Sequence, residues 1–331
     1  MPKEYAHWIL AEKVYLALEN PDLKSLIEDN KSLYELGAVI PDTPFYSFLG
    51  RRAREFLSAG WGLHGQDGEN TFAFISYLNR FYDLENEDVR NNPIWTFILG
   101  VITHIVADSQ FHPFVYYFSG SPFFPDPKVS KKAHCRHRMI ETYLDLYYMQ
   151  LSNLRHRGKL AAVLKNIGLE KAELFTLLSC LLFSRDDYSH KALQRSIWRH
   201  TTIQSKFFSN HYMTILRTVN KLPFIDLDDV IALFYPKQRE MKIPLFQKPF
   251  RYCHPVTGEM SEQSIPDLEN RVIKMCHEIF SDLESWRRGR SPNFRLEDLQ
   301  GPSAYTGLSA SKSETMAYFK IQDVKRLLFS S

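Results

Sequence analysis

The chain has 331 residues, of which 44% are hydrophobic and 24% charged, and its formal net charge is +3. These are the values of an ordinary globular protein, and so small a charge gives no ground to expect binding to nucleic acid or to a membrane. The four cysteines form no CxxC pair, a pattern typical of neither a disulfide framework nor a thiolate zinc site. The first residues lack the pattern of a signal peptide and no run of 18 apolar residues occurs, so we expect a cytoplasmic location and no transmembrane segment.

Helical periodicity dominates the first two thirds of the chain. Residues 2–19 carry an apolar stripe that includes Val14, with His7 on the same face, and they predict a helix. Residues 20–50 are rich in turn residues and predict a connector. Further helices are expected at 51–59, 69–83, 93–111, 131–151, 159–166, 170–184 and 187–220.

The last third of the chain has a different residue pattern. Residues 235–266 hold five prolines and few periodic apolar positions, so we predict a long loop that acts as a lid. A helix is expected at 267–287, buttressing the others, and the polar tail from 288 shows no clear pattern. The sequence therefore predicts an all-α fold, with a helical domain over 1–220 and a C-terminal extension over 221–331 that belongs to the same domain.

The segment GVITHIVADSQFHP, residues 100–113, places ionisable side chains in an apolar helix. His104 and Asp108 are four residues apart and point the same way, and His112 follows one turn later, at the helix end that Pro113 predicts. Burying an unpaired carboxylate costs several kcal/mol, a cost that a metal ion removes. Imidazole and carboxylate on one helical face are a common way to present two ligands to zinc.

A second pair, His137 and Glu141, repeats this spacing in HRMIETYLD. Asp42 lies between two prolines in IPDTP, and His64 lies in GLHG, where glycine lets the backbone turn sharply. A lone histidine such as His7 is more often a core residue, and a single His/Asp pair is more often a solvated face or an internal hydrogen bond. Two such pairs together with isolated histidine and aspartate favour a site with more than one metal ion.

The residues of these segments and the order of the segments resemble the zinc-dependent phospholipase C family, whose all-α fold is shared with the single-strand-specific zinc nucleases. The resemblance is carried by GxxTHxxAD…HP followed by HxxxE, within YAHWILAEKV … LGAVIPDT … LHG … FILGVITHIVADSQFHPF … HRMIETYLD. It covers roughly residues 4–150, and beyond 150 the likeness is one of helical texture.

The resemblance implies two or three zinc ions. Its ligand assignments are Asp42, His64, His104 and Asp108 for one zinc, His112, His137 and Glu141 for a second, and His7 with a bridging Asp108 for a third. Secreted members of the family also hold the third ion with the amino group of the mature N-terminus. This chain departs from that pattern, because Met1 lies six residues before His7.

Zinc ions in such a site would activate a water molecule as nucleophile and stabilise charge on a phosphoryl group. Asp42 is the candidate general base, or the group that orients the attacking water, besides being a ligand. His134 is an alternative ligand to His137, and Asp145 is a candidate to orient a ligand histidine from behind.

We therefore expect a zinc-dependent hydrolase of phosphate esters, similar to a phospholipase C that cleaves phosphodiesters. Two alternatives stay open: a nuclease or a hydrolase of nucleotides or other phosphate esters, and a metal-stabilised binding protein without activity. A lipid substrate predicts an apolar groove beside the metals, whereas nucleic acid predicts an aromatic shelf and a basic track. The side chains that could build either are Phe72, Phe74, Phe111, Phe114, Phe123 and Phe124.

Overall fold

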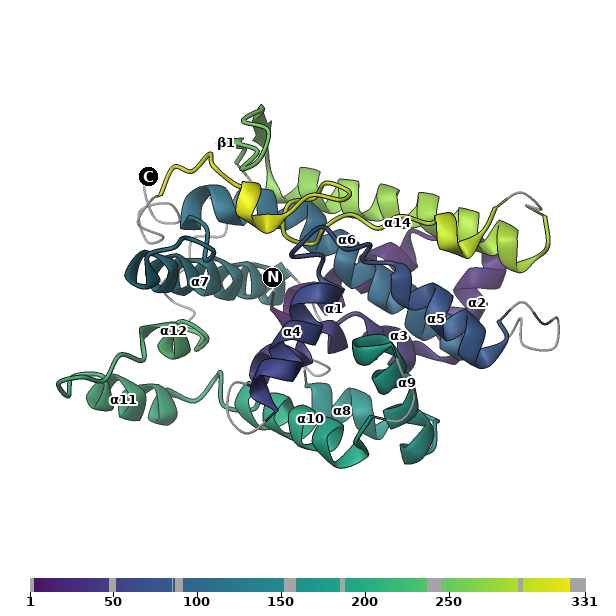
Figure 1. The fold of residues 1–331 in the computed structure, drawn as a ribbon, viewed down its shortest axis with the longest axis horizontal. Coiled ribbons are helices and arrows are strands. Elements are labelled where there is room, and N and C mark those ends of the chain that lie inside the picture. The colour runs from purple at the N-terminus through teal and green to yellow at the C-terminus, as the bar shows by residue number, and fades with distance from the viewer. Residues whose placement is uncertain are drawn as a thin grey trace.

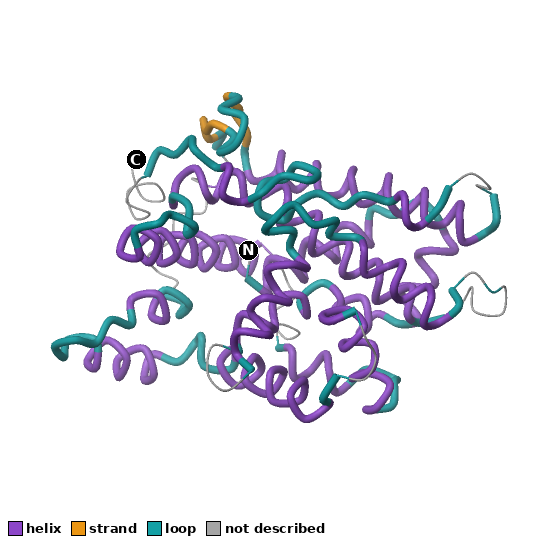
Figure 2. Tube along the Cα trace, viewed as in Figure 1, coloured by secondary structure: helices purple, strands orange, loops and turns teal. Residues whose placement is uncertain are grey.

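The structure is a computed structural model that describes residues 3–47, 52–84, 86, 92–151, 159–184, 188–236, 246, 248–290 and 294–321. Its α-helices are α1 (Glu4–Leu16), α2 (Pro21–Asp29), α3 (Lys31–Gly37), α4 (Ala53–Leu63), α5 (Ala73–Tyr82), α6 (Ile94–Ser119), α7 (Pro127–Leu151), α8 (Leu160–Lys165), α9 (Lys171–Phe183), α10 (His190–Gln204), α11 (Asn210–Val219), α12 (Asp228–Ile231) and α14 (Ile265–Arg287). Its 3-10 helices are η1 (Ile40–Tyr46), η4 (Leu296–Asp298) and η5 (Ser313–Thr315). The described residues contain one sheet, the hairpin of β1 (Phe250–Cys253) and β2 (Met260–Gln263), so the all-α fold class is confirmed (Figure 2).

Helix α6 is the centre of the core, and α1, α3, α7 and α14 pack around it (Figure 1). Every residue of α6 except Gln110 is buried. The helix is long and apolar enough to cross a membrane by length and composition alone, but 94% of its apolar window is buried inside the structure. A buried core helix of a folded domain passes the same test, so this helix is weak evidence for a membrane span.

Helices α3 and α6 approach each other at two glycines. A Cβ atom on Gly100 would lie 2.3 Å from the carbonyl oxygen of Tyr34, and one on Gly37 would lie 2.4 Å from the carbonyl oxygen of Phe97. Only glycine allows so close a backbone contact. The contact fixes the residue after α3, Ala38, against the turn of α6 that follows Gly100.

The predicted connector over 20–50 is wrong, because this stretch forms α2, α3 and η1. The side chain of Asn20 accepts hydrogen bonds from the backbone N–H groups of Asp22 (3.0 Å) and Leu23 (3.2 Å), and Pro21 occupies the first helical position. Asparagine at the N-cap followed by proline is a helix-start signal. That signal outweighs the general enrichment in turn residues.

The predicted helix end at 111 is also wrong, since α6 continues through Pro113 to Ser119. Proline has no N–H group and leaves the carbonyl of Ser109 without its helical donor. The C-terminal tail packs at this point, so closely that a Cβ on Gly307 would lie 2.5 Å from that oxygen. His112 therefore lies within the helix, one turn beyond Asp108.

The other predicted helices are present with shifted ends, except that the single helix predicted over 187–220 is two helices, α10 and α11. Turns at 205–208 separate the two. The helix predicted from 131 begins earlier, at Pro127. Residues 2, 51 and 187 of the predicted ranges lie outside the described residues.

The C-terminal part packs back onto the N-terminal helices. A capping box at Ser264 and Asp267 starts α14, which lies along α6 and α1 (Figure 1). The side chain of His277 donates a hydrogen bond to the carbonyl of Val14 (3.0 Å), which ties α14 to α1. The helix expected at 267–287 is therefore present and contacts the helices that carry the candidate site.

The segment predicted as a lid, 235–266, contains the β1–β2 hairpin, and its residues 237–245 and 247 lie outside the described residues. The ring of Phe250 in β1 packs against Phe114 of α6 at 5.2 Å between centroids. Phe114 is two residues beyond His112, so the two side chains leave α6 on nearly opposite sides. The hairpin thus contacts α6 away from His112, and a lid role for the whole segment stays a prediction.

Candidate metal centre

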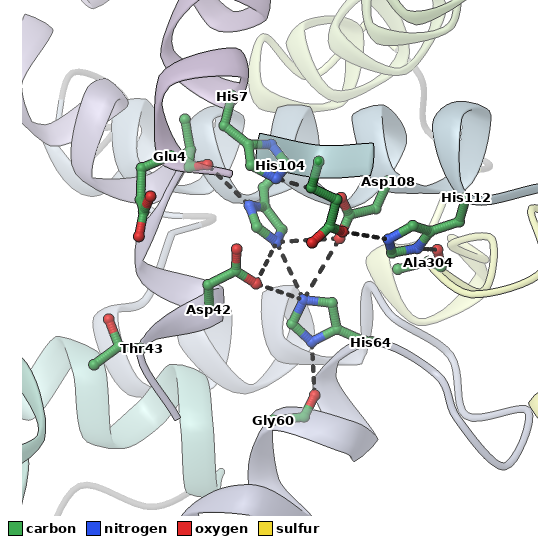
Figure 3. Close-up of polar contacts among 12 residues, drawn as sticks. Glu4, His7, Asp42, Thr43, Gly60, His64, His104, Asp108, His112 and Ala304 are labelled. Carbon is green, nitrogen blue, oxygen red and sulfur yellow. Dashed lines mark hydrogen bonds and ion pairs between the residues drawn. The ribbon is translucent and has the colours of Figure 1, made fainter. Parts of the chain in front are cut away.

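Three buried histidines share one arrangement, in which the Nδ1 atom of each ring faces a backbone carbonyl. The distances are 2.6 Å from His64 to the oxygen of Gly60 and 2.9 Å from His104 to that of Ala38, and His112 makes the same contact with Ala304 (Figure 3). A carbonyl oxygen can only accept, so each neutral ring carries its hydrogen on Nδ1. The Nε2 lone pair of each ring then faces away from the carbonyl, which is the usual orientation of a metal-binding histidine.

The first cluster consists of Asp42, His64, His104 and Asp108, whose ligand atoms all lie within 4.8 Å of one another. The two histidines face each other with 3.1 Å between their Nε2 atoms. Asp42 directs Oδ1 at both rings, 3.4 Å from His64 Nε2 and 3.5 Å from His104 Nε2 (Figure 3). All four side chains are buried, so water cannot screen their mutual repulsion.

Asp108 lies between the first cluster and His7. Its Oδ2 is 3.4 Å from His104 Nε2, and its Oδ1 is 3.3 Å from His7 Nε2. Among the described residues neither oxygen has a partner in hydrogen-bonding geometry, although the carboxylate is fully buried. The ring of His7 stacks on that of His104 at 4.0 Å. The carboxylate is therefore placed to contact cations on both of its sides.

The second cluster consists of His112, His137 and Glu141, which also bring their ligand atoms within 4.8 Å of one another. Glu141 Oε1 is 2.7 Å from His137 Nε2 and 3.7 Å from His112 Nε2. His137 and Glu141 occupy successive turns of α7, while His112 comes from α6. The packing of these two helices therefore brings the cluster together.

The supporting elements explain the order of the ligands in the chain. Helix α6 presents His104, Asp108 and His112 on three successive turns. His64 caps the C-terminus of α4, and Asp42 lies in η1, where flanking prolines shape the backbone. Elements far apart in the sequence thus meet around one stretch of α6.

The pKa shifts describe an excess of negative charge in the first cluster. Burial alone would raise the pKa of Asp42, but His104 and His64 outweigh it and hold the pKa well below its ordinary value. Burial would lower the pKa of His104, yet the carboxylates of Asp42 and Asp108 outweigh burial and raise it. In the second cluster burial lowers the pKa of His112 to about 3, so this ring is neutral at neutral pH. Ionised carboxylates and neutral imidazoles are the forms that bind metal ions.

The donor set fits a metal ion. Two Nε2 lone pairs facing each other at 3.1 Å repel unless a proton or a cation lies between or beside them. Imidazole nitrogens with carboxylate oxygens suit zinc, whereas magnesium and calcium prefer sites made of oxygen alone. Each of the two clusters could therefore hold a metal ion.

The C-terminal tail completes the site, a contact that no pattern in the sequence predicts. Ala304 accepts the hydrogen bond of His112, and its own N–H donates to the carbonyl of His64 (2.9 Å). The ring of Tyr305 lies 6.1 Å from each of these two imidazoles. The polar tail carries no periodicity or motif that would have predicted this contact.

A second missed feature is a buried network behind the first cluster. His200 places Nε2 2.9 Å from Glu4 Oε1 and Nδ1 2.9 Å from the hydroxyl of Thr43, the residue after Asp42. The hydroxyl of Tyr46 also donates to Glu4, at 2.5 Å. The network joins α10 and η1 to α1, and so holds the segments of Asp42 and His7 together.

The two remaining residues singled out from the sequence lie outside both clusters. His134 is not among the ligand groups that the described residues form. The carboxylate of Asp145 accepts hydrogen bonds from the N–H of Ala6 (2.7 Å) and the hydroxyl of Tyr235 (2.6 Å). Asp145 therefore contacts the backbone next to His7 and positions the start of α1.

A family model described as zinc dependent phospholipase C matches residues 6–216. This span covers more than half of the chain and contains both clusters and His7. The chain therefore belongs to the zinc-dependent phospholipase C family, which confirms the resemblance carried by its motifs. No curated protein and no solved structure matches the chain significantly.

Proposed function

We propose that this protein is a zinc-dependent hydrolase of phosphate esters, with a phospholipase C-like phosphodiester as its substrate. One observation carries the proposal: His64 and His104 direct their Nε2 lone pairs at each other, with the oxygens of Asp42 and Asp108 around them. Two buried carboxylates and two facing imidazole nitrogens are costly to keep together unless a metal ion or a proton compensates them. Membership of the family supports the same conclusion.

The proposed ligands are those of the two clusters, with His7 and Asp108 available to a third ion. When bound, the ions would polarise a phosphoryl oxygen and lower the pKa of a water molecule. The carbonyls of Ala304 and Ala38 fix the tautomers of His112 and His104 that a metal ligand requires. The chain therefore supplies ligands that need little rearrangement on binding.

Asp42 is proposed to act as a ligand and to orient the attacking water. Its lowered pKa makes it a weak proton acceptor, which favours orientation over general-base catalysis. Asp42, His137 and Glu141 are 5–6% exposed, whereas His64, His104, Asp108 and His112 are 0% exposed. We infer that substrate approaches from the side of these three residues.

The phenylalanines considered as a substrate surface divide into two groups. Four of them are buried in the core and do not face solvent: Phe72, Phe74, Phe111 and Phe114. Phe123 is partly exposed, and its ring lies 5.4 Å from that of Tyr305, beside both clusters. Phe124 is also partly exposed, but its ring packs against Phe319 at 5.4 Å between centroids. Phe123 is therefore the aromatic residue of this set that lies beside Tyr305 and is placed to contact a substrate.

The test is a screen of the zinc-loaded protein against phosphatidylcholine, a soluble phosphodiester, a phosphomonoester and single-stranded DNA. We expect hydrolysis of phosphodiester lipids that chelation abolishes and zinc restores. Hydrolysis of DNA alone would replace the proposed substrate with nucleic acid. Full zinc occupancy without hydrolysis of any substrate would indicate a binding protein. The cytoplasmic location expected from the sequence stays a prediction.

A further inference from the structure

Helix α11 and the loop after it expose an apolar surface at the edge of the molecule, away from the central helices (Figure 1). We call the α11 surface the exposed side chains of Phe208, Tyr212, Ile215, Leu222, Phe224 and Ile225. Tyr212 and Ile215 lie three residues apart on one face of α11, Phe208 lies in the turn before the helix, and the other three lie in the loop after it. Met213 is the buried residue of α11. The helix thus exposes Tyr212 and Ile215 to solvent, and the segments at its two ends expose the other members of the α11 surface.

The loop after α11 displays its apolar tip in a fixed shape. Phe224 is fully exposed and has a φ of 69°, a conformation that costs a non-glycine residue on the order of 1 kcal/mol or more. The side chain of Asn220 holds the loop, because it accepts from the N–H of Leu227 (2.5 Å) and donates to Asp228 (2.8 Å). No contact among the residues that the structure describes accounts for holding an exposed phenylalanine in this way.

The charge around the α11 surface is positive. No Asp or Glu occurs between Tyr188 and Ile225, and the basic residues of this stretch are Lys191, Arg195, Arg199, Lys206, Arg217 and Lys221. Of the first three acids that follow, two pair with basic residues of α7, Asp226 with Lys131 at 3.0 Å and Asp229 with Arg138 at 3.1 Å. The third, Asp228, accepts a hydrogen bond from Asn220 (2.8 Å). The charge of Asp228 therefore stands against Lys206, Arg217 and Lys221, the three basic residues that lie in or next to α11 in the sequence.

We propose that the α11 surface docks on a lipid bilayer that carries anionic headgroups. A helix with an exposed apolar face, flanked by lysine and arginine, binds in the interface of such a bilayer. A second copy of this chain fits less well, because a two-fold contact would bring the same basic residues together. Nucleic acid would use the positive charge but not the apolar tip formed by Leu222, Phe224 and Ile225.

Helix α12 connects the α11 surface to α7, the helix that carries His137 and Glu141 of the second metal cluster. The loop that carries the surface leads into α12, which packs against α7. Arg138 and Thr142, the neighbours of His137 and Glu141, donate hydrogen bonds to the backbone carbonyls of Asp229 (3.0 Å) and Ala232 (2.8 Å). Docking would therefore bring the membrane close to the cluster, although docking itself does not depend on the metals or on hydrolysis.

The test is flotation of the full chain with vesicles, either of phosphatidylcholine alone or of phosphatidylcholine mixed with phosphatidylglycerol, in the presence of a chelator. We expect partitioning into the mixed vesicles that high salt weakens. At about 1 kcal/mol for each basic residue near the surface, Arg217→Gln with Lys221→Gln should weaken partitioning by about 30-fold. Phe224→Ser should weaken it by about tenfold, because the ring no longer enters the apolar layer.

Matched controls are Lys274→Gln on α14 and Leu16→Ser at the end of α1, both strongly exposed residues. These variants should partition like the wild type, and all four should unfold at the wild-type temperature. Equal partitioning into both kinds of vesicle, or equal partitioning of all variants, would overturn the proposal. So would a wild-type dimer that Phe224→Ser converts to a monomer, because the surface would then be a contact between copies. If the wild type partitions into the mixed vesicles but hydrolyses no phosphate ester, the proposed function is contradicted and the docking proposal stands.

Discussion

His64 and His104 place their Nε2 atoms 3.1 Å apart, while the Nδ1 atom of each ring faces a backbone carbonyl. Both rings are fully buried, and the carboxylates of Asp42 and Asp108 lie beside them. Both Nε2 atoms are acceptors in the neutral tautomer that the carbonyls select, so this set needs either an added proton, which the raised pKa of His104 favours, or a metal ion. A cation satisfies all four groups at once.

Removal of metal should destabilise the protein. A ligand that binds only the folded state adds about 2.7 kcal/mol to the free energy of unfolding when its concentration is 100 times the dissociation constant. We expect a chelator to lower the midpoint of urea unfolding, and zinc to restore it. Magnesium should not restore it, because imidazole ligands disfavour that ion. A midpoint of urea unfolding that changes with neither chelator nor zinc would show that neither cluster binds metal.

Replacement of Gly100 by alanine should disturb both the fold and the first cluster. The new Cβ would meet the carbonyl of Tyr34 at 2.3 Å, so α3 must move away from α6. We expect a loss of about 3 kcal/mol in the free energy of unfolding and weaker zinc binding, because Ala38 no longer orients His104. Gly168→Ala is the control, since nothing lies within 4 Å of its Cβ. Equal stability of the two variants would contradict the close approach.

His200→Ala should leave the Glu4 carboxylate buried without its imidazole partner. A buried carboxylate that loses a hydrogen-bond partner costs about 1–3 kcal/mol, and we expect a destabilisation near the upper end of this range in urea unfolding. Zinc affinity should also fall, because Thr43 and the neighbouring Asp42 lose their link to α10. The control is His190→Ala, at the exposed start of the same helix. Wild-type stability of the His200 variant would show that the network does not support the fold.

Asp145 should make stability fall as pH rises from about 4 to about 7. Burial raises the pKa of its carboxyl from 3.8 to about 7, so in this range the folded state holds a proton that the unfolded state has lost. Stability is then fully present below the unfolded pKa and decreases until pH passes the folded pKa. We expect Asp145→Asn to flatten this part of the pH profile of unfolding. An identical slope in both proteins would mean that the carboxyl is ionised throughout.

The sequence predicts which side chains come together in the two clusters because much of their spacing is local. His104, Asp108 and His112 follow at intervals of four residues, and so do His137 and Glu141, so helical geometry alone aligns each set. The pattern does not depend on where the helix ends. The wrong prediction that α6 ends near Pro113 therefore did not change which residues were predicted to come together.

The missed features depend on contacts between distant segments. Pro113 is accommodated within α6 at the point where Gly307 packs against Ser109, and no local pattern reveals that partner. The same holds for Ala304, which joins His64 to His112, and for His200, which binds Glu4. Helix α2 is different, since Asn20 and Pro21 form a local start signal that could have been recognised.

The metal content of the purified chain shows directly whether the two clusters bind zinc. After dialysis against zinc and removal of free ions, we expect at least two zinc ions per wild-type chain, one for each cluster. Asp108→Asn should lose zinc from the first cluster and Glu141→Gln from the second, while the exposed control Asp282→Asn keeps the wild-type content. A wild-type chain without zinc, or cluster variants that retain full zinc content, would show that these clusters are not the zinc sites.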